Sequence, residues 1–376
     1  MESQEPMKVL IVTYNYLTGY GGGAFGARAY INAFSALYED VTLLYPVREG
    51  ETGPDGLREG IRKIGVADPA PRPAKLARIL FKGVLHRFEK PFRALLAREC
   101  FDVIVFQNSK CSSRIIRDAR ASGARIVVVH DNFEQEYTRD NTPLLLRPIL
   151  LPATVRTERE AVRTADLNLV LTPDDARLFA AQYGGNIALW GTFEYGPSQP
   201  RASVAVCEPV FAITGNLGAR QTVSSLLPWL SDYYPILKEM VPDARLLVAG
   251  KEASTALQQR LAEVGAEFVD TPADMSAVLA RARYYLCPVN CGGGVKLRVM
   301  DGLREGLPAL VHRVSARGYE AFEGLSLFVY DDPASFRKAL SALLSCDSDP
   351  ARGRELYDRI FSFEAGVERL RKLMQP

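Results

Sequence analysis

The chain has 376 residues, and because one domain takes roughly 150 residues, this length favours two or three domains. Hydrophobic residues make up 47% and charged residues 24%, which is the balance of a folded globular protein and excludes disorder or collagen-like repeats as a description of the whole. The 46 Lys and Arg residues against 44 Asp and Glu residues give a formal net charge of +2. This near-neutrality argues against a general nucleic-acid-binding protein, which carries a strong basic excess.

Short apolar runs alternate with longer amphipathic stretches through the first half of the chain. Continuous apolar strands separated by helices are typical of a parallel sheet that is covered on both faces. The predicted strands are Lys8–Thr13, Val41–Tyr45, Val103–Gln107, Arg125–His130, Leu167–Thr172 and Ile187–Trp190. The predicted helices include Ala24–Leu37, Ser112–Ser122, Pro148–Ala165 and Pro173–Tyr183.

A glycine-rich loop, Gly21-Gly22-Gly23-Ala24-Phe25-Gly26, follows the first strand and opens a helix. Its pattern matches Gly-x-Gly-x-x-Gly, in which free helix amides can approach a phosphate. A dinucleotide site also needs a tight turn and an acid at the end of the second strand. Here eight loop residues intervene and the second strand ends Leu44-Tyr45-Pro46. We therefore favour a substrate or phosphate loop over a nicotinamide site; a loop without a ligand is the other alternative.

Residues 72–98 contain eight basic residues and one acid, Glu89, so this segment carries +7 and the rest of the chain −5. Apolar residues recur there at helical spacing: Leu76, Ile79, Leu80, Val84 and Phe88. A basic amphipathic helix suits an anionic membrane surface. The alternative, with about equal weight, is that the apolar stripe packs on the domain and the basic face is only solvated.

The segment 192–209 interrupts the alternation with Gly196, Pro197, Pro200 and Pro209, which predicts a linker between two domains, 1–205 and 206–359. The alternation then restarts with strands at Val210–Thr214, Arg245–Ala249, Glu267–Val269, Tyr284–Pro288, Pro308–Val311 and Leu327–Tyr330, and with helices that include Val223–Met240 and Val295–Glu305. The predicted fold class is α/β, with two Rossmann-like, doubly wound parallel-sheet domains. Ligands of such folds bind at the carboxyl ends of the strands, so we expect a cleft between the domains.

A second glycine loop, Gly292-Gly293-Gly294, lies between a predicted strand and a predicted helix. Lys296 follows at once, where an ammonium could neutralise a diphosphate together with free helix amides. Asp301 lies one to two helical turns further on, where a carboxylate could bind a ribose diol. The alternative makes Lys296 and Arg298 a solvated helix face and Asp301 a surface acid.

The cysteines and the termini bear on location. None of the six cysteines forms a Cys-x-x-Cys pair and the three histidines are scattered, so a zinc site is not expected and free thiols in a reducing cytoplasm are. The polar residues 1–6 do not resemble a signal peptide, and no apolar run is long enough to span a membrane. We expect a cytoplasmic protein, peripheral on the inner face of a membrane if 72–98 docks there.

The segment Gly292–Pro308 resembles the donor-binding segment of family 4 glycosyltransferases of the GT-B fold, which commonly reads Gly-x-Gly-x-Lys-x-Lys-x-Leu-Glu-Ala and then Gly-x-Pro. Three more stretches are similar to that family: Val129-His130-Asp131, Ala165–Thr172 and Phe211–Leu217. These stretches occur in the family's order and the likeness covers nearly the whole chain.

The resemblance implies a role for each matched residue. Asp301 takes the place of the second glutamate of Glu-x7-Glu, which holds the ribose, while the first glutamate is replaced by Gly293. Arg220 and Lys296 correspond to the basic residues that bind the diphosphate. His130 corresponds to a histidine near the transferred sugar. The implied catalytic residues are His130 and Asp301, and the implied donor-binding residues are Gly22, Gly23, Asn216, Arg220, Gly292, Gly293, Gly294, Lys296 and Asp301.

The resemblance also implies the reaction. A sugar would pass, with retention, from a UDP-, GDP- or dTDP-sugar to a hydroxyl of a glycan or lipid-linked acceptor in cell-surface polysaccharide or glycolipid synthesis. No cofactor is expected. No metal is expected either, because Asp347-Ser348-Asp349, which matches the Asp-x-Asp of metal-dependent transferases, precedes Pro350 as a helix-capping turn would. The C-terminal helix, 360–376, would pack back on the first domain, which binds the acceptor.

Three further points stay open. Asn132, Glu134 and Glu136 follow His130 and are acceptor-side candidates, with a solvated acidic loop as the equal alternative. A nucleotide-sugar 2-epimerase of the same fold is an alternative activity, although three histidines make it less favoured. A degenerate transferase that acts as a scaffold is the second alternative, because Gly293 stands in place of a glutamate.

Overall fold

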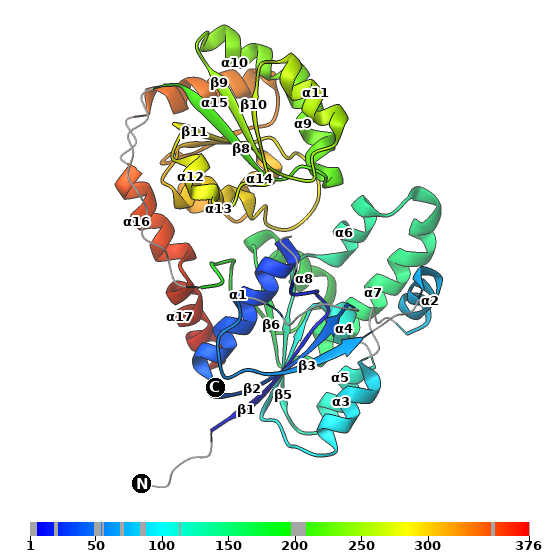
Figure 1. The fold of residues 1–376 in the computed structure, drawn as a ribbon. Coiled ribbons are helices and arrows are strands. Elements are labelled where there is room, and N and C mark those ends of the chain that lie inside the picture. The colour runs from blue at the N-terminus through cyan, green and yellow to red at the C-terminus, as the bar shows by residue number, and fades with distance from the viewer. Residues whose placement is uncertain are drawn as a thin grey trace. The chain divides into compact units, whose positions relative to one another are not determined.

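The computed structural model describes residues 6–18, 22–48, 54, 56–67, 71–82, 88–112, 114–196, 208–346 and 350–375. The chain divides into two compact units, unit 1 (residues 1–197 and 361–376) and unit 2 (residues 198–360) (Figure 1). Most of the predicted linker, 197–207, lies outside the described residues, as does the acidic turn 347–349. No helix of the described ranges is long and apolar enough to cross a membrane.

Unit 1 contains a parallel sheet of seven strands in the order β3-β2-β1-β4-β5-β6-β7. The strands are β1 (Lys8–Thr13), β2 (Asp40–Val47), β3 (Arg62–Ala67), β4 (Val103–Gln107), β5 (Arg125–Val129), β6 (Leu167–Val170) and β7 (Ile187–Leu189). Strand β3 was not predicted; its residues are half-buried or exposed at the sheet edge. An edge strand lacks the continuous apolar run by which a buried parallel strand is recognised.

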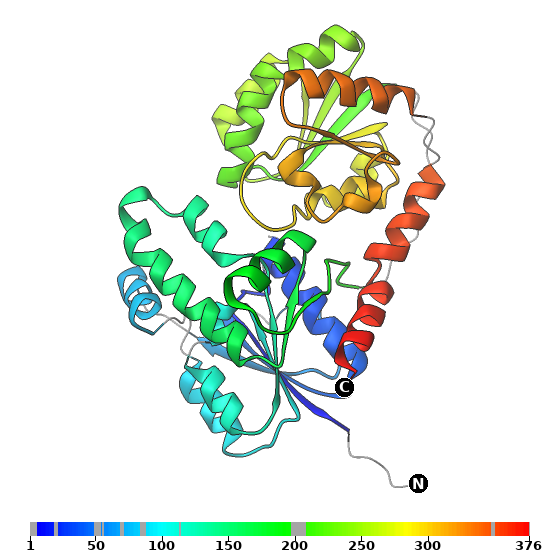
Figure 2. The ribbon, with the colours of Figure 1, turned by 180° about the vertical axis from the view of Figure 1, so that it is seen from behind.

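The helices of unit 1 cover both sides of its sheet: α1 and α17 lie together on one side, and α3 and α5 on the other (Figures 1 and 2). The helices are α1 (Gly22–Leu37), α2 (Arg72–Lys82), α3 (Glu89–Leu96), α4 (Ser109–Ser112), α5 (Ile115–Ala121), α6 (Glu134–Asn141), η1 (Leu144–Leu146), α7 (Arg147–Thr164), α8 (Pro173–Tyr183) and α17 (Phe363–Met374). Phe88 and Phe92 at the start of α3 are buried in the core. The apolar stripe predicted in 72–98 therefore packs internally at Phe88, while 83–87 lie outside the described residues.

Unit 2 repeats this arrangement with six parallel strands in the order β10-β9-β8-β11-β12-β13. The strands are β8 (Val210–Asn216), β9 (Arg245–Lys251), β10 (Glu267–Asp270), β11 (Tyr284–Cys287), β12 (Ala309–His312) and β13 (Leu327–Tyr330). The helices are α9 (Arg220–Asp232), α10 (Tyr234–Met240), α11 (Thr255–Glu263), α12 (Met275–Leu279), α13 (Arg298–Arg304), α14 (Arg313–Ala316), η2 (Glu320–Phe322), α15 (Pro333–Ser345) and α16 (Pro350–Phe361).

Two predicted helices of unit 2 were wrong in extent. The range Val223–Met240 is two helices, α9 and α10, which meet at Tyr233 with Pro235 in the first turn of the second. Proline is well tolerated in a first helical turn but removes a hydrogen bond from a helix interior, so a new helix starts there. The helix predicted from Val295 begins only at Arg298, because the preceding loop is held by Lys296, as described below.

The C-terminal helix α17 is part of unit 1, where it packs on α1 and on the segment after β7. The Trp190 Nε1–H group donates a hydrogen bond to the Gly366 carbonyl at 2.9 Å, and Arg369 Nε donates to the Trp190 carbonyl at 2.8 Å. A Cβ atom on Gly366 would lie 2.3 Å from the Phe193 ring. The absence of a side chain at Gly366 is therefore required for this contact.

Replacing Gly366 with alanine is expected to lower the free energy of unfolding by about 1–3 kcal/mol, because the added methyl group overpacks a buried aromatic ring. Gly353→Ala in α16 is the matched control, since its Cβ would meet only ordinary contacts at 3.9 Å and alanine favours a helix. Urea unfolding of both variants measures the difference; a Gly366→Ala midpoint at or above that of Gly353→Ala would contradict the packing argument.

Candidate functional site

The strand order places the candidate site in each unit. It reverses between β1 and β4 in unit 1 and between β8 and β11 in unit 2. In open parallel sheets, ligands bind outside the carboxyl ends of the strands at such a reversal. The residues that follow these four strands, and β5 beside β4, are therefore the ones to consider.

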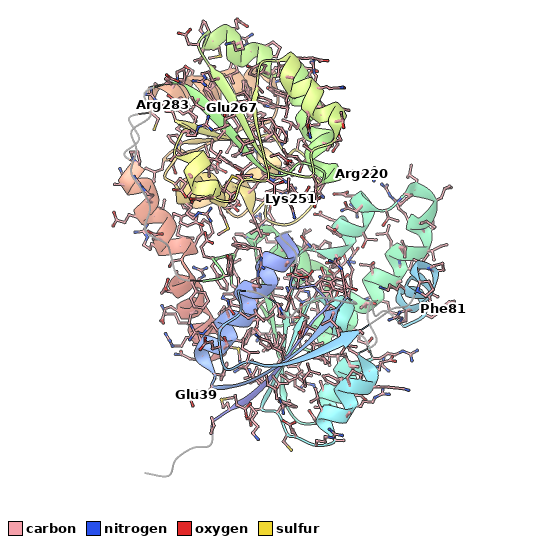
Figure 3. The ribbon with its side chains drawn as sticks, in the orientation of Figure 1. Glu39, Phe81, Arg220, Lys251, Glu267 and Arg283 are labelled. Carbon is pink, nitrogen blue, oxygen red and sulfur yellow. The ribbon has the colours of Figure 1, made fainter. Side chains whose placement is uncertain are left out.

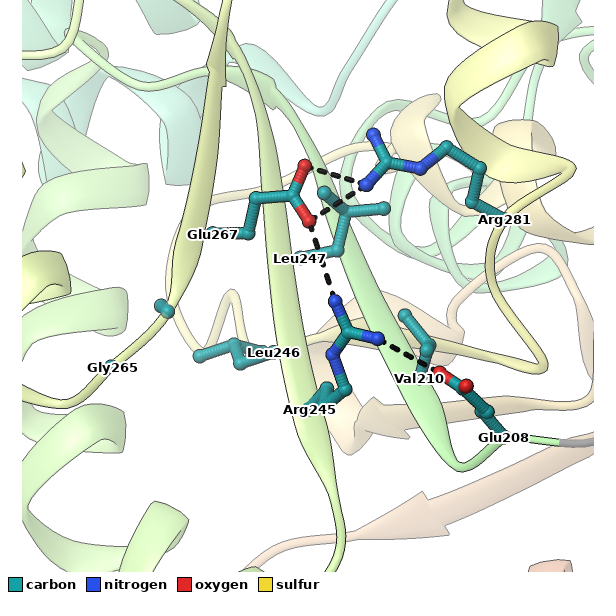
Figure 4. Close-up of a pocket in the computed structure, with 9 residues that line it drawn as sticks. Glu208, Val210, Arg245, Leu246, Leu247, Gly265, Glu267 and Arg281 are labelled. Atoms are coloured by element: carbon teal, nitrogen blue, oxygen red, sulfur yellow. Dashed lines mark hydrogen bonds and ion pairs between the residues drawn. The ribbon is translucent and has the colours of Figure 1, made fainter.

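A pocket of about 440 Å³ lies at the other, amino-terminal edge of the unit 2 sheet (Figure 4). Its charged residues are paired with one another: Glu267 with Arg281 at 2.6 Å, and Arg245 with Glu208 at 2.8 Å and with Glu267 at 3.9 Å. This ion-pair network joins the starts of β8, β9 and β10. We assign it a structural role, because its charges are mutually satisfied and it lies at the wrong edge of the sheet.

A chain of hydrogen bonds crosses the carboxyl ends of β1, β4 and β5 in unit 1. Thr13 Oγ1 donates to Gln107 Oε1 at 2.5 Å, and Gln107 Nε2 donates to Asp131 Oδ1 at 3.3 Å. The other carboxylate atom, Asp131 Oδ2, is buried and has no hydrogen-bond partner among the described residues. Burial raises the pKa of Asp131 to about 7, against the lowering effect of the Gln107 hydrogen bond. A half-protonated carboxyl with one free oxygen can exchange a hydrogen bond or a proton with a hydroxyl group.

Asp131 was not among the predicted site residues, although the stretch Val129-His130-Asp131 lies at a predicted strand end. The signal for Asp131 in the sequence was its place directly after a strand predicted to be buried and parallel. Its value as a site residue depends on Gln107 and Thr13 of neighbouring strands, which no local pattern indicates.

His130 is buried against Phe179, with 4.3 Å between the ring centres. Its Nε2 lies 3.0 Å from Asn168 Oδ1. The Asn168 amide group donates to the carbonyls of Val162 and Asn186, so its oxygen faces the ring and Nε2 carries the proton.

The state of His130 follows from these contacts. Burial lowers its pKa to about 4, so the imidazole is neutral at pH 7. Its Nδ1 is a buried acceptor without a partner among the described residues. The geometry thus presents a neutral hydrogen-bond acceptor, suited to a hydroxyl group and not to a negative charge.

One of the two expectations placed Glu134 in a solvated acidic loop, and for this residue it is wrong. Glu134 is buried, accepts a hydrogen bond from Asn108 Nδ2 at 2.6 Å and forms an ion pair with Lys110. Asn108 adopts a φ of 71°, a left-handed conformation that asparagine tolerates better than most residues. Of the other two acceptor-side candidates, Asn132 and Glu136 are half-buried, and the acceptor-side role remains a prediction.

The Lys110–Glu134 pair is connected by hydrogen bonds to a second buried acid, Glu158. The Glu134 amide donates to Glu158 Oε1 at 2.8 Å, and the Tyr183 hydroxyl donates to Glu158 Oε2 at 2.7 Å. Burial raises the pKa of Glu158 to about 8, although both hydrogen bonds oppose that shift. This network fixes α6 against α7 and α8, directly after the strand end that carries His130.

The first glycine loop meets the same edge of the unit 1 sheet. Gly22 and Gly23 open α1 and are exposed, while Gly21 lies outside the described residues. A Cβ atom on Gly23 would lie 2.8 Å from Asn15 Oδ1, and Asn15 Nδ2 is buried without a hydrogen-bond partner in the described part of the chain. The glycines thus let the start of α1 approach Asn15, which presents an unused donor beside the helix N-terminus.

In unit 2 the structure brings Lys296 and the second glycine loop together. The Lys296 ammonium is buried and donates to the carbonyls of Gly292 and Gly293 at 2.8 Å and of Gly294 at 3.4 Å. Positive φ angles at Gly292 and Gly294 turn the loop so that its carbonyls converge. Burial lowers the pKa of Lys296 to about 8, because the ammonium loses its hydration and forms no ion pair within the described part of the chain. We name this arrangement the lysine–glycine cradle.

Asn216 and Arg220 lie at the carboxyl end of β8. Asn216 Oδ1 accepts from the amides of Gly218 and Ala219 at 2.9 and 3.0 Å, and its Nδ2 donates to Glu252 Oε2 at 2.8 Å. Arg220 begins α9 and is exposed, with Lys251 toward the same end of the unit and Glu267 toward the other (Figure 3). Asn216 therefore shapes the loop, and Arg220 projects at the edge where ligands are expected.

Asp301 lies on α13 and faces β8. Its Oδ2 accepts from Thr214 Oγ1 at 2.7 Å, and its Oδ1 lies 3.5 Å from Arg304 Nη2. The nearby Arg298 donates to Thr222 Oγ1 at 2.8 Å, and a Cβ atom on Gly215 would lie 2.9 Å from Arg298 Cζ. Arg298 thus fills the space beside Gly215. The alternative in which Lys296 and Arg298 form a solvated helix face does not describe this arginine.

No family model and no curated protein sequence matches the chain. Solved structures do match it over nearly its whole length. A glycosyltransferase from Rickettsia africae has a TM-score of 0.68 at 8% identity, covering 98% of each chain. Sucrose-phosphate synthase from Thermosynechococcus elongatus has a TM-score of 0.64 at 15% identity, covering 98% of this chain and 95% of the other. HepE of Anabaena, solved with UDP and glucose, has 0.63 at 13%, covering 97% and 98%.

These neighbours and the two sheets agree on one architecture. Each unit is a Rossmann-like parallel sheet with flanking helices, and the matches extend through both units. The chain has the GT-B fold, as the sequence resemblance predicts.

Glu158 is expected to make stability depend on pH. Its folded pKa of about 8 lies above its ordinary value of 4.5, so its contribution is fully present below pH 4.5 and is lost as the pH rises through 8. The slope can reach about 1.4 kcal/mol per pH unit within that window.

Urea unfolding of the wild type and of Glu158→Gln, from acid to alkaline pH, isolates this contribution because His130 and Asp131 titrate equally in both. The stability difference between the two proteins should shift in favour of the variant as the pH rises. A difference that stays constant across the window would show that Glu158 does not titrate as described.

Proposed function

We propose that this protein is a glycosyltransferase that moves a sugar from a nucleotide-sugar donor to a hydroxyl of a glycan or lipid-linked acceptor. The observation that carries the proposal is the lysine–glycine cradle, a buried ammonium at the carboxyl edge of unit 2 that forms no ion pair with any residue described in the structure. A diphosphate would supply an anionic partner. The fold supports this assignment, since HepE, which shares it, was solved with UDP.

The donor-binding roles follow the predicted set. Lys296 and Arg220 would bind the diphosphate, with help from the amides of Gly292, Gly293 and Gly294. Asp301 would bind the ribose by exchanging its contact with Thr214 or Arg304 for the diol. Gly22 and Gly23 would approach the donor phosphate from the N-terminus of α1, and Asn216 would hold the loop that precedes Arg220.

The proposed chemistry relies on positioning and charge. The departing diphosphate would be stabilised by Lys296, Arg220 and loop amides, and the incoming hydroxyl would pass its proton to the leaving phosphate oxygen on the same face, with retention. The neutral His130 ring suits a role in orienting the transferred sugar through Nδ1. Neither a metal nor another cofactor is part of this proposal.

The proposed acceptor belongs to cell-surface polysaccharide or glycolipid synthesis, in the cytoplasm at the inner face of a membrane. Within 72–98, α2 is the part suited to an anionic lipid surface, because α3 starts with core residues. Product assays distinguish the two alternatives from the proposed activity. A 2-epimerase would give epimerised nucleotide sugar and a scaffold would give no product, whereas a transferase gives transferred sugar and released nucleoside diphosphate.

Thermal-shift screening against UDP, GDP, ADP and dTDP and their sugars tests donor binding, because a ligand that binds only the folded state raises the melting temperature. One nucleotide should stabilise the wild type. Lys296→Met should weaken its binding about tenfold to a hundredfold, which corresponds to roughly 1.5–3 kcal/mol for hydrogen bonds to a charged group. Lys372→Met, at an exposed side chain on α17, is the control and should bind normally. No shift with any nucleotide would remove the proposal.

Nucleotide affinity is also expected to depend on pH through Lys296. The charged ammonium is lost as the pH rises through about 8, so affinity should fall by up to about tenfold per pH unit above that value. Isothermal titration from pH 7 upward measures this. An affinity that is flat in the wild type, or that declines equally in Lys296→Met, would mean that another group is responsible.

A further inference from the structure

Strand pairing ends before the loop that carries the lysine–glycine cradle. Strand β11 pairs with β12 up to Cys287 and with β8 at Tyr284 and Tyr285, so the register of the sheet does not reach residues 289–296. Side chains of neighbouring elements in unit 2 position this loop instead. Hydrogen bonds from such neighbours decide how firmly a binding group is held.

Helix α9 holds the first half of the loop through Ser225. This serine is buried, and its Oγ accepts a hydrogen bond from the Asn290 amide at 3.1 Å. The same oxygen lies 2.9 Å from Asn290 Oδ1 and 2.8 Å from the Gln221 carbonyl, to which its one proton can be donated in turn. Gln221 lies against the next part of the loop, since a Cβ atom on Gly292 would be 2.2 Å from its Nε2. The backbone from Asn290 to Gly292 is therefore fixed on α9.

The two ends of the loop are fixed by α14 and by the residue that precedes η2. Ser315 Oγ donates to the Val289 carbonyl at 2.6 Å, and the Tyr319 hydroxyl donates to the Lys296 carbonyl at 3.1 Å. Both side chains are buried. The Ser225 contact differs from these two, because it fixes the segment directly before the glycines whose carbonyls surround the Lys296 ammonium.

Helix α9 also carries the other basic residue proposed for the diphosphate. It begins with Arg220, and Ser225 lies five residues further on, about 7.5 Å along the helix axis. One helix thus presents Arg220 and holds the loop of Lys296. The contact between Ser225 and Asn290 therefore helps to set the separation of two cations that would share one diphosphate.

We infer that Ser225 is a positioning residue for donor binding: by holding Asn290, it keeps the glycine carbonyls around the Lys296 ammonium and sets this ammonium relative to Arg220. Ser225 acts through the loop and not by touching the donor. Its effect on nucleotide affinity rests on the proposed function, whereas its effect on the Lys296 ammonium does not.

Competitive acetylation of the full-length protein, without nucleotide, tests the effect on Lys296. Labelling with acetic anhydride from about pH 6 to pH 11, read by peptide mass spectrometry, gives the pH midpoint at which this lysine becomes reactive. The wild-type midpoint should lie at about 8, where burial places the pKa of Lys296. Ser225→Ala should move the midpoint upward by roughly half a pH unit or more, because a loosened loop lets water reach the ammonium.

Ser224→Ala is the matched control. Ser224 is the exposed neighbour on the same helix, and its hydroxyl lies 3.7 Å from Cys291 Sγ, so this variant should keep the wild-type midpoint. Asn290→Ala removes the other side of the Ser225 contact at an exposed position and should shift the midpoint upward as well. It decides the question if Ser225→Ala does not fold. Because both residues act through one contact, the double variant should shift the midpoint by less than the sum of the single shifts.

Nucleotide affinity is the second measurement. For the nucleotide that stabilises the wild type, Ser225→Ala should weaken binding about twofold to tenfold, the loss expected for one hydrogen bond, and Ser224→Ala should leave it unchanged. The inference is overturned if Ser225→Ala keeps the wild-type midpoint or the wild-type affinity, or if wild-type Lys296 titrates like an ordinary exposed lysine. A wild type that binds no nucleotide would remove the proposed function, while the labelling midpoints would still support or overturn the role of Ser225 in holding Lys296.

Discussion

Parallel pairing of adjacent strands is the constraint on which the candidate site depends. Thr13 lies in register with Gln107, and Gln107 with Val129, so the residues that follow three strands emerge side by side at one edge. That row makes possible the hydrogen bonds from Thr13 to Gln107 and on to Asp131. The same topology in unit 2 brings the ends of β8 and β11, and with them Asn216 and the lysine–glycine cradle, to one edge.

Burial decides what these groups can do chemically. His130 and Asp131 are neighbours in sequence, and burial favours the uncharged form of each. It lowers the pKa of His130, which leaves the ring neutral, and raises the pKa of Asp131, which leaves the acid partly protonated. Both keep an atom without a partner in the described structure. A polar atom that is buried and unused is costly in a folded protein, which is the physical reason to expect that a substrate completes this edge.

In unit 2, burial likewise affects the charge state of Lys296. Three glycine carbonyls replace the water around its ammonium but bring no negative charge, so the lysine is held in place with a lowered pKa. The arrangement also explains why α13 starts at Arg298: the backbone from Gly292 to Lys296 is committed to the cradle. A charge held in position before the ligand arrives needs little reorganisation during a reaction.

Local patterns were sufficient for much of the fold. The apolar runs of β1, β4 and β13 and the periodic pattern of α8 predicted the observed bounds, because buried parallel strands and amphipathic helices carry their periodicity in consecutive residues. Edge strand β3 and the late start of α13 were not predicted. Strand β3 lacks a buried face, and the start of α13 depends on Lys296, which folds back on its own loop.

The sequence by itself determined the two-fold alternation of strands and helices, the position of both glycine loops and the candidacy of His130, Lys296 and Asp301. Only the tertiary structure decided that Glu134 pairs with Lys110 inside the protein, that Asp131 is held by Gln107, and that Asp301 faces Thr214. Each of these contacts joins residues more than twenty positions apart. A linear pattern records which side chains are available; strand order and burial determine which of them meet and in what charge state.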